Sequence, residues 1–163
     1  MARGTLTRVA DIIRADIDDL VSRMEDPTKL VRQMILEMED AVDDAVASVG
    51  NAVANERLLE RRIRERRGEE QLWEEKAEQA LEAGEEDLAR RALERKVTVL
   101  AAAEDMENAL EEASHITTQL KQQLAGFRQK LDEARTRQRS LAARHRAAQD
   151  PSRRPTGPLS SST

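Results

Sequence analysis

The sequence predicts an all-α protein, a long antiparallel helical hairpin of coiled-coil type that is preceded by a short amphipathic helix. Charged residues make up 36% of the 163 residues and aromatic residues only 1%, which excludes an ordinary aromatic-filled core. Ala, Glu, Arg, Leu and Gln dominate the composition, as in long helices. Helix breaks are few, because the chain has only six Gly and four Pro. Each helix is expected to pair along an apolar seam, since isolated helices are marginally stable.

The first predicted element is an amphipathic helix over residues 2–24, which forms a separate N-terminal domain (residues 1–24). At 100° per residue its apolar side chains fall into one stripe about 120° wide. The stripe consists of Leu6, Val9, Ala10, Ile13, Ile17, Leu20, Val21 and Met24. Arginines outside the stripe can meet anionic lipid headgroups, each contributing on the order of 1 kcal/mol. The residues predicted to bind an anionic membrane surface are Arg3, Leu6, Arg8, Val9, Ile13, Arg14 and Ile17.

Two other interpretations of this stripe remain open. The stripe can pack onto the hairpin and never meet lipid, or it can dock there and leave when lipid competes. Asp16, Asp18 and Asp19 would be repelled by anionic lipid, so the membrane-facing part is expected within residues 2–14.

Sparse helix breakers divide the rest of the chain. Asp26 can cap a helix whose first residue is Pro27, a position that tolerates proline. Gly84 suits a left-handed helix end, and the acidic residues after it suit a new helix N-terminus. A tight hairpin turn is therefore predicted at Gly84, between helices over residues 27–83 and 86–149.

The hairpin thus occupies residues 26–149, and a different kind of sequence follows it. Residues 150–163 are rich in Pro and Ser and hold almost no apolar side chain. Such a segment cannot bury enough apolar surface to fold, so a disordered tail is expected.

Each long helix carries a seam of residues at steps of three and four. In the first long helix these steps connect Val31, Met34, Met38, Val42, Ala45, Val49 and Val53. In the second they connect Leu110, Ala113, Thr117, Leu120, Leu124, Phe127, Leu131, Ala134, Gln138 and Leu141. Such spacing places side chains on one helix face and favours pairing of the two helices. Few seam residues fall between Arg61 and Arg67, where looser packing is expected.

Charge is unevenly distributed along the chain, whose net charge is -5. Residues 57–67 and 128–154 are basic, whereas residues 69–112 are acidic. A basic stretch of one copy can lie along an acidic stretch of another, which favours a homo-oligomer or polymer. Solvated helix faces explain the same pattern equally well. No nucleic-acid partner is expected, because no aromatic platform accompanies either basic stretch.

Few residues suggest any other site. Trp73 lies at seam spacing with Ala77 and Leu81, which is typical of a packing residue, although an aromatic side chain near a hairpin turn can also dock a protein. Glu112 and His115 have the Glu-x-x-His spacing of di-iron bundles, but the second motif that such a site needs is missing. No metal or other cofactor is therefore expected.

Neither catalysis nor export is expected from the sequence. It has no phosphate-binding loop, no nucleophile elbow and no zinc-protease motif, so the chain is not expected to be an enzyme. It also has no apolar run as long as a signal peptide or a membrane span requires. Any contact with a bilayer is then expected from its surface.

Four segments resemble a known family. They are EDPTKLVRQMILEMED (residues 25–40), WEEKAEQAL (73–81), EDLARRALERK (86–96) and TRQRSLAARHRAA (136–148). They resemble the phage shock protein A and vesicle-inducing protein in plastids family, and the similarity covers about residues 1–149. Full-length members continue into further helices where this sequence has its Pro-rich stretch, so the resemblance to the family does not include those C-terminal helices.

The resemblance implies a bacterial relative of the ESCRT-III membrane-remodelling proteins, cytoplasmic and peripheral on the inner face of the plasma membrane. The expected function is a self-assembling protein that maintains or remodels the inner membrane in the response to envelope stress. An alternative is a soluble helical-hairpin regulator that binds and inhibits a AAA+ transcription activator. A third is a purely structural coiled-coil scaffold.

Overall fold

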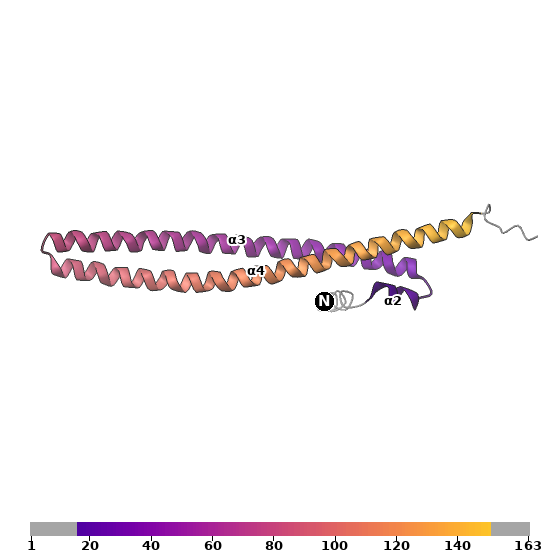
Figure 1. The fold of residues 1–163 in the computed structure, drawn as a ribbon, viewed down its shortest axis with the longest axis horizontal. Coiled ribbons are helices and arrows are strands. Elements are labelled where there is room, and N and C mark those ends of the chain that lie inside the picture. Colours follow the sequence, from indigo (N-terminus) through magenta and orange to yellow (C-terminus); the bar gives the residue numbers. More distant parts are fainter. Residues whose placement is uncertain (1–15, 151–163) are drawn as a thin grey trace, which may run out of the picture. The chain divides into compact units, whose positions relative to one another are not determined.

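Three helices make up almost all of the described chain. The computed structural model describes residues 16–150, in which helix α2 spans Ile17–Ser22, α3 spans Pro27–Glu82 and α4 spans Glu86–Gln149. Of these residues 93% are helical, and none forms a strand. Helices α3 and α4 run antiparallel and pack against each other (Figure 1). The predicted all-α fold with a long helical hairpin is confirmed.

The start of α3 follows the predicted capping pattern. The backbone N–H of Lys29 donates a hydrogen bond to the Asp26 carboxylate at 3.2 Å. Pro27 is the first helical residue, where its missing N–H costs no helical hydrogen bond. Local sequence therefore determines where this helix begins.

Helix α2 differs from the continuous helix predicted over residues 2–24. Asp16 has an extended backbone (φ -75°, ψ 116°), and its side chain accepts a hydrogen bond from the N–H of Asp18 at 2.9 Å. An Asp in this position satisfies a free backbone donor, and so a helix begins at Ile17. This helix ends at Ser22, two residues before the predicted end.

Two predicted elements fall largely outside the described residues. Residues 1–15 would carry most of the predicted N-terminal helix, and residues 151–163 nearly all of the predicted tail. The predictions for these two segments therefore stay predictions.

The turn between α3 and α4 lies at the predicted glycine. Gly84 has φ +74°, a left-handed conformation that glycine adopts without steric cost. The N–H of Glu85 donates to the carbonyl of Ala80 at 2.8 Å, and the N–H of Gly84 donates to the carbonyl of Leu81 at 3.0 Å. This pair of hydrogen bonds defines a Schellman motif, which satisfies carbonyls that the helix end would leave free.

The chain forms two compact units, each with its own core. The first unit contains α2, α3 as far as Asp43 and α4 from Ala125 onward. Its buried apolar residues are Ile17, Val21, Val31, Met34, Ile35, Met38, Phe127, Leu131 and Ala134. They come from all three helices, and most of them belong to the predicted seams.

The second unit, residues 44–124, is the part of the hairpin that includes the turn. Its core is narrow and consists mainly of alanine. The buried residues are Ala45, Ala77, Ala80, Ala89, Ala92, Val99, Ala103, Thr117 and Leu124. None of residues 61–67 is buried, as expected from their few apolar side chains.

Candidate functional site

The residues predicted to bind a membrane are only partly described. Arg3, Leu6, Arg8, Val9, Ile13 and Arg14 lie outside the described residues. Ile17 lies in α2, where it and Val21 are each 4% exposed. Contact of Ile17 with lipid therefore requires α2 to leave its place in the first unit.

An ion pair links α2 to α4 in the first unit. Arg137 Nη1 lies 3.2 Å from Asp18 Oδ1, and the Asp18 side chain is 73% exposed. Arg137 Nε is buried and makes no hydrogen bond. Because a buried unpaired donor is unfavourable and an exposed ion pair is weak, this contact stabilises α2 only modestly.

Beside this ion pair, α2 and α4 border an open polar groove. Asp16, Ile17 and Asp18 line one side, and α4 residues between Gln129 and Ser140 line the other. Within it Glu133 accepts hydrogen bonds from Lys130 Nζ at 2.9 Å and Gln129 Nε2 at 3.1 Å. The hydrogen bond from Lys130 is the main reason that the pKa of Glu133 lies below its usual value, and the nearby Asp16 opposes it. Glu133 is therefore held as a carboxylate.

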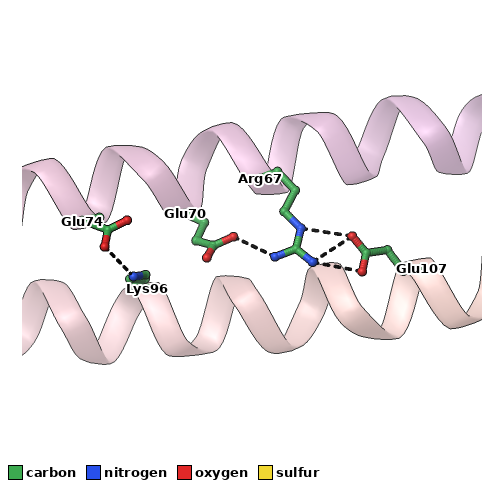
Figure 2. A network of polar contacts seen from close by, with 5 residues as sticks. All are labelled: Arg67, Glu70, Glu74, Lys96 and Glu107. Atoms are coloured by element: carbon green, nitrogen blue, oxygen red, sulfur yellow. Dashed lines mark hydrogen bonds and ion pairs between the residues drawn. The ribbon is translucent and has the colours of Figure 1, made fainter.

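Polar residues connect α3 and α4 in the second unit, as Figure 2 shows. The Arg67 guanidinium donates to both oxygens of the Glu107 carboxylate at 2.9–3.0 Å, and its Nη1 donates to Glu70 at 3.0 Å. Lys96 Nζ on α4 lies 2.9 Å from Glu74 Oε1 on α3. Two-point binding of a carboxylate by arginine fixes geometry as well as contributing energy. These contacts therefore set the register of the two helices, and the hydrogen bond to Glu107 raises the pKa of Arg67.

These polar contacts between α3 and α4 also join the basic and acidic stretches of the sequence. Arg67 belongs to the basic stretch and Glu107 to the acidic stretch, yet the two pair within one chain. Sequence reasoning proposed pairing between copies and missed this contact. The signal was present, because Arg67 continues the steps of three and four that connect Ile63 with Glu70.

Trp73 lies at the edge of the helix pair near the turn and is half-buried. Its Nε1 donates to Glu69 Oε1 at 3.5 Å, and the Lys76 ammonium lies 4.3 Å from the ring centroid, a cation–π contact. The predicted seam partner Ala77 is 2% exposed, but Leu81 is 57% exposed. The seam passes through Ala80 instead, because the smaller side chain lets the helices approach.

A groove opens beside Trp73 on one face of the hairpin. Its lining includes the Trp73 ring, Leu88 of α4 and the cations of Lys76, Arg91 and Arg95. Glu85 and Glu94 also line it. The groove therefore combines an aromatic ring, apolar surface and an excess of cations.

Large apolar side chains are exposed on the same stretch of the chain. They are Leu72, Leu81, Leu88, Leu93 and Val97, each between 44% and 64% exposed. We call residues 69–100 the hairpin tip. Five exposed large apolar side chains on this short stretch make the hairpin tip a candidate interaction surface.

Residues 16–150 support neither a metal site nor a membrane span. His115 is exposed and hydrogen bonds only with Gln119, at 3.2 Å, and residues 16–150 contain no cluster of three side chains fit to hold a metal ion. Within the same residues, no helix combines the length and hydropathy that crossing a bilayer demands.

The family follows from comparison with known proteins. The profile of the PspA/IM30 family matches residues 4–152. The chain belongs to the PspA/IM30 family. Membrane-associated protein Vipp1 of Synechocystis sp. is 34% identical over 145 residues, 89% of this chain and 54% of that protein. A phage shock protein A homolog of Deinococcus radiodurans is 35% identical over 142 residues, 87% of this chain and 64% of that protein.

Protein LiaH of Bacillus subtilis is less similar, 26% identical over 143 residues, 88% of this chain and 64% of LiaH. The chain spans about half to two thirds of the length of these relatives. Membership confirms the resemblance seen in the sequence. PspA/IM30 proteins are structural or regulatory proteins and not enzymes, in agreement with the prediction for this chain.

Proposed function

We propose that this chain binds an anionic membrane surface peripherally and self-assembles there, and so maintains or remodels the bacterial inner membrane under envelope stress. It would act on the cytoplasmic face of the plasma membrane. The names of two relatives support the membrane part, a membrane-associated protein and a phage shock protein A homolog.

The observation that carries the proposal is the apolar stripe of the N-terminal segment. The stripe begins with Leu6 and Val9 in the sequence and continues to Ile17 and Val21 of α2. The break at Asp16 divides it, so residues 1–15 can insert while α2 stays in the first unit. Apolar burial of that short segment would give weak binding, which anionic headgroups around Arg3, Arg8 and Arg14 would strengthen.

Assembly supplies the affinity that a single segment lacks. When many copies lie side by side, each further insertion occurs at high effective concentration, and the overall affinity rises well above that of one copy. Exposed apolar side chains at the hairpin tip support such association.

Vesicle co-sedimentation tests the membrane part. The full chain is compared with a chain lacking residues 1–15, using phosphatidylglycerol-containing vesicles and pure phosphatidylcholine vesicles. The full chain should bind the anionic vesicles, and the truncated chain should lose most of that binding. The truncation leaves α2 and the hairpin intact, so circular dichroism should show that the hairpin is still helical.

Removal of residues 151–163 is the matched control and should leave vesicle binding unchanged. A second variant, Arg3→Glu with Arg8→Glu and Arg14→Glu, keeps the stripe and reverses its cations. If both N-terminal variants sediment with anionic vesicles as the full chain does, the assignment of this segment is wrong.

One specific observation favours the alternative function, that of a soluble helical-hairpin regulator. Trp73 and the apolar side chains at the hairpin tip would suit the docking of a protein such as a AAA+ transcription activator. Inhibition of such an activator by a chain starting at Asp16, which cannot insert the N-terminal segment, would support this function over membrane binding.

A further inference from the structure

Helix α2 buries the second half of the apolar stripe that begins in the N-terminal segment. Ile17 and Val21 lie four residues apart, so they share one face of α2, and each is only 4% exposed. The core that contains them also includes Val31 and Met38 of α3 and Leu131 of α4. As long as α2 stays in this place, its part of the stripe is unavailable to lipid.

Few contacts attach α2 to the rest of the first unit. The helix has six residues and buries two of them. In its ion pair with Arg137 of α4, the Asp18 side chain is 73% exposed. An exposed ion pair contributes little, and a helix this short has little stability of its own. Docking of α2 therefore depends mainly on Ile17 and Val21.

Two features beside the ion pair oppose docking. Arg137 Nε is buried without a hydrogen-bond partner, so its guanidinium is only partly satisfied. The pKa of Glu133 is lowered chiefly by the hydrogen bond from Lys130, and the Asp16 carboxylate acts in the opposite direction. Asp16 and Glu133 therefore repel each other while α2 is docked. Release of α2 would separate these carboxylates and free Arg137 to pair elsewhere.

We propose that α2 is a latch, docked on the first unit in solution and released at an anionic membrane, where Ile17 and Val21 move from the protein core into the lipid. Residues 1–15 insert first, and lipid then competes with α3 and α4 for the apolar side of α2. Loss of the cap at Asp16 would let one helix continue through residues 2–24. This inference rests on the proposed membrane function and names the contact that regulates it.

A closed latch lowers the affinity of the chain for a membrane. When the form that binds best is only a minor population, the apparent affinity falls in proportion to that population. A change that weakens docking and leaves the inserted residues intact should therefore strengthen membrane binding. Arg137 separates this effect from simple charge attraction. Removal of a cation predicts weaker binding to anionic lipid by attraction alone, whereas the latch predicts stronger binding.

Arg137→Gln is the first test. With phosphatidylglycerol-containing vesicles, this variant should bind about two- to fivefold more tightly than the unmodified chain, the change expected from loss of an exposed ion pair. The matched control is Arg139→Gln, which removes the same charge from an exposed residue that hydrogen bonds to Thr136 within α4. The control should bind no more tightly than the unmodified chain. Thermal unfolding checks that both variants remain folded.

A covalent link provides the second test, because the sequence contains no cysteine. Asp18→Cys with Arg137→Cys places two thiols at the position of the ion pair, where a short bis-methanethiosulfonate reagent can join them. The linked chain should bind the same vesicles at least about fivefold more weakly than the same sample after treatment with a reductant, since the link excludes the released form.

Spin labels show directly whether α2 moves. Labels on Ser22→Cys of α2 and Arg139→Cys of α4, two exposed positions, should give a narrow distance distribution in solution. Phosphatidylglycerol-containing vesicles should replace it with longer distances. Pure phosphatidylcholine vesicles should leave it unchanged, because they lack the anionic headgroups.

Three results would each overturn the latch. They are an unchanged label distance on vesicles that bind the chain, a linked chain that binds as well as the reduced one, and an Arg137→Gln variant that binds no more tightly. Each would mean that α2 stays docked while residues 1–15 act alone, and the membrane function would stand. If neither the unmodified chain nor Arg137→Gln binds vesicles, the membrane function fails and the latch fails with it.

Discussion

Asp18 of α2 and Arg137 of α4 form an ion pair at 3.2 Å that joins the first and the last described helices. The Asp18 side chain is 73% exposed, whereas that of Arg137 is 22% exposed. Apart from this pair, α2 depends on two buried side chains, Ile17 and Val21. A six-residue helix attached in this way is expected to open well before the hairpin does.

The substitution Asp18→Asn should therefore have a small effect on global unfolding, at most about 1 kcal/mol, because the pair is largely exposed. Amide hydrogen exchange of α2 should nevertheless accelerate, since local opening becomes easier. The exposed Asp19→Asn is a partial control that removes a neighbouring carboxylate. Unchanged exchange in α2 would show that the ion pair does not restrain this helix.

Gly84→Ala should destabilise the second unit by about 1–2 kcal/mol, because an alanine at φ +74° is strained. A Cβ at this position meets nothing within 4 Å, so the cost comes from the backbone alone. A Cβ at Gly50, inside α3, also meets nothing within 4 Å. Gly50→Ala should therefore stabilise the second unit by about 0.5–1 kcal/mol. Chemical denaturation of the two variants should give shifts of opposite sign.

Met38→Ala should lower the free energy of unfolding of the first unit by about 2–5 kcal/mol, because the Met38 side chain is fully buried and its removal leaves a cavity. Leu36→Ala is the matched control on the same helix, and Leu36 is 58% exposed. The control should lower the free energy of unfolding much less, as measured in the same thermal or urea titration. Equal losses for both variants would contradict the core described here.

Glu133→Gln should lower the melting temperature at neutral pH and have progressively less effect in acid. The pKa of Glu133 is lowered in the folded state, chiefly by the hydrogen bond from Lys130. The stabilisation is therefore present above the ordinary carboxyl pKa of 4.5 and is lost as the pH falls through the lowered value. Glu25→Gln, on the exposed segment before α3, is the control and should leave the melting temperature at neutral pH nearly unchanged.

Arg67→Ala and Glu107→Ala should not be additive. Each single substitution leaves a charged partner without its two-point contact, so the double variant should lose less stability than the two single variants together. The coupling should shrink in high salt because both side chains are half-exposed. Additive losses at low salt would mean that this pair does not set the helix register.

Much of the fold could be predicted from the sequence, because the determinants are local. Asp26 and Pro27 start α3, and Gly84 gives the left-handed turn, through interactions within a few residues. The seams were likewise readable from spacing, and Met38 and Leu131 are buried as predicted.

The rest depends on competition between local and distant contacts. The helical pattern over residues 2–24 gives no sign of a break at Asp16. That break depends on the hydrogen bond that the Asp18 N–H donates to the Asp16 side chain, which competes directly with continuation of the helix. Near the turn, an apolar residue at Leu81 suggested the seam, but close packing of the helices favours the smaller Ala80. Pairing of Arg67 with Glu107 required knowing which residues face each other across the hairpin.

The link between α3 and α4 has only three residues, so it cannot absorb a change in the length of one helix. Insertion of a single residue between Ala77 and this link would rotate the rest of α3 by about 100° and move its seam away from α4. A change confined to one arm would also slide Arg67 past Glu107. Length differences among such hairpins should therefore arise as matched additions or losses of seven residues in both arms, since seven residues return a seam to nearly the same direction.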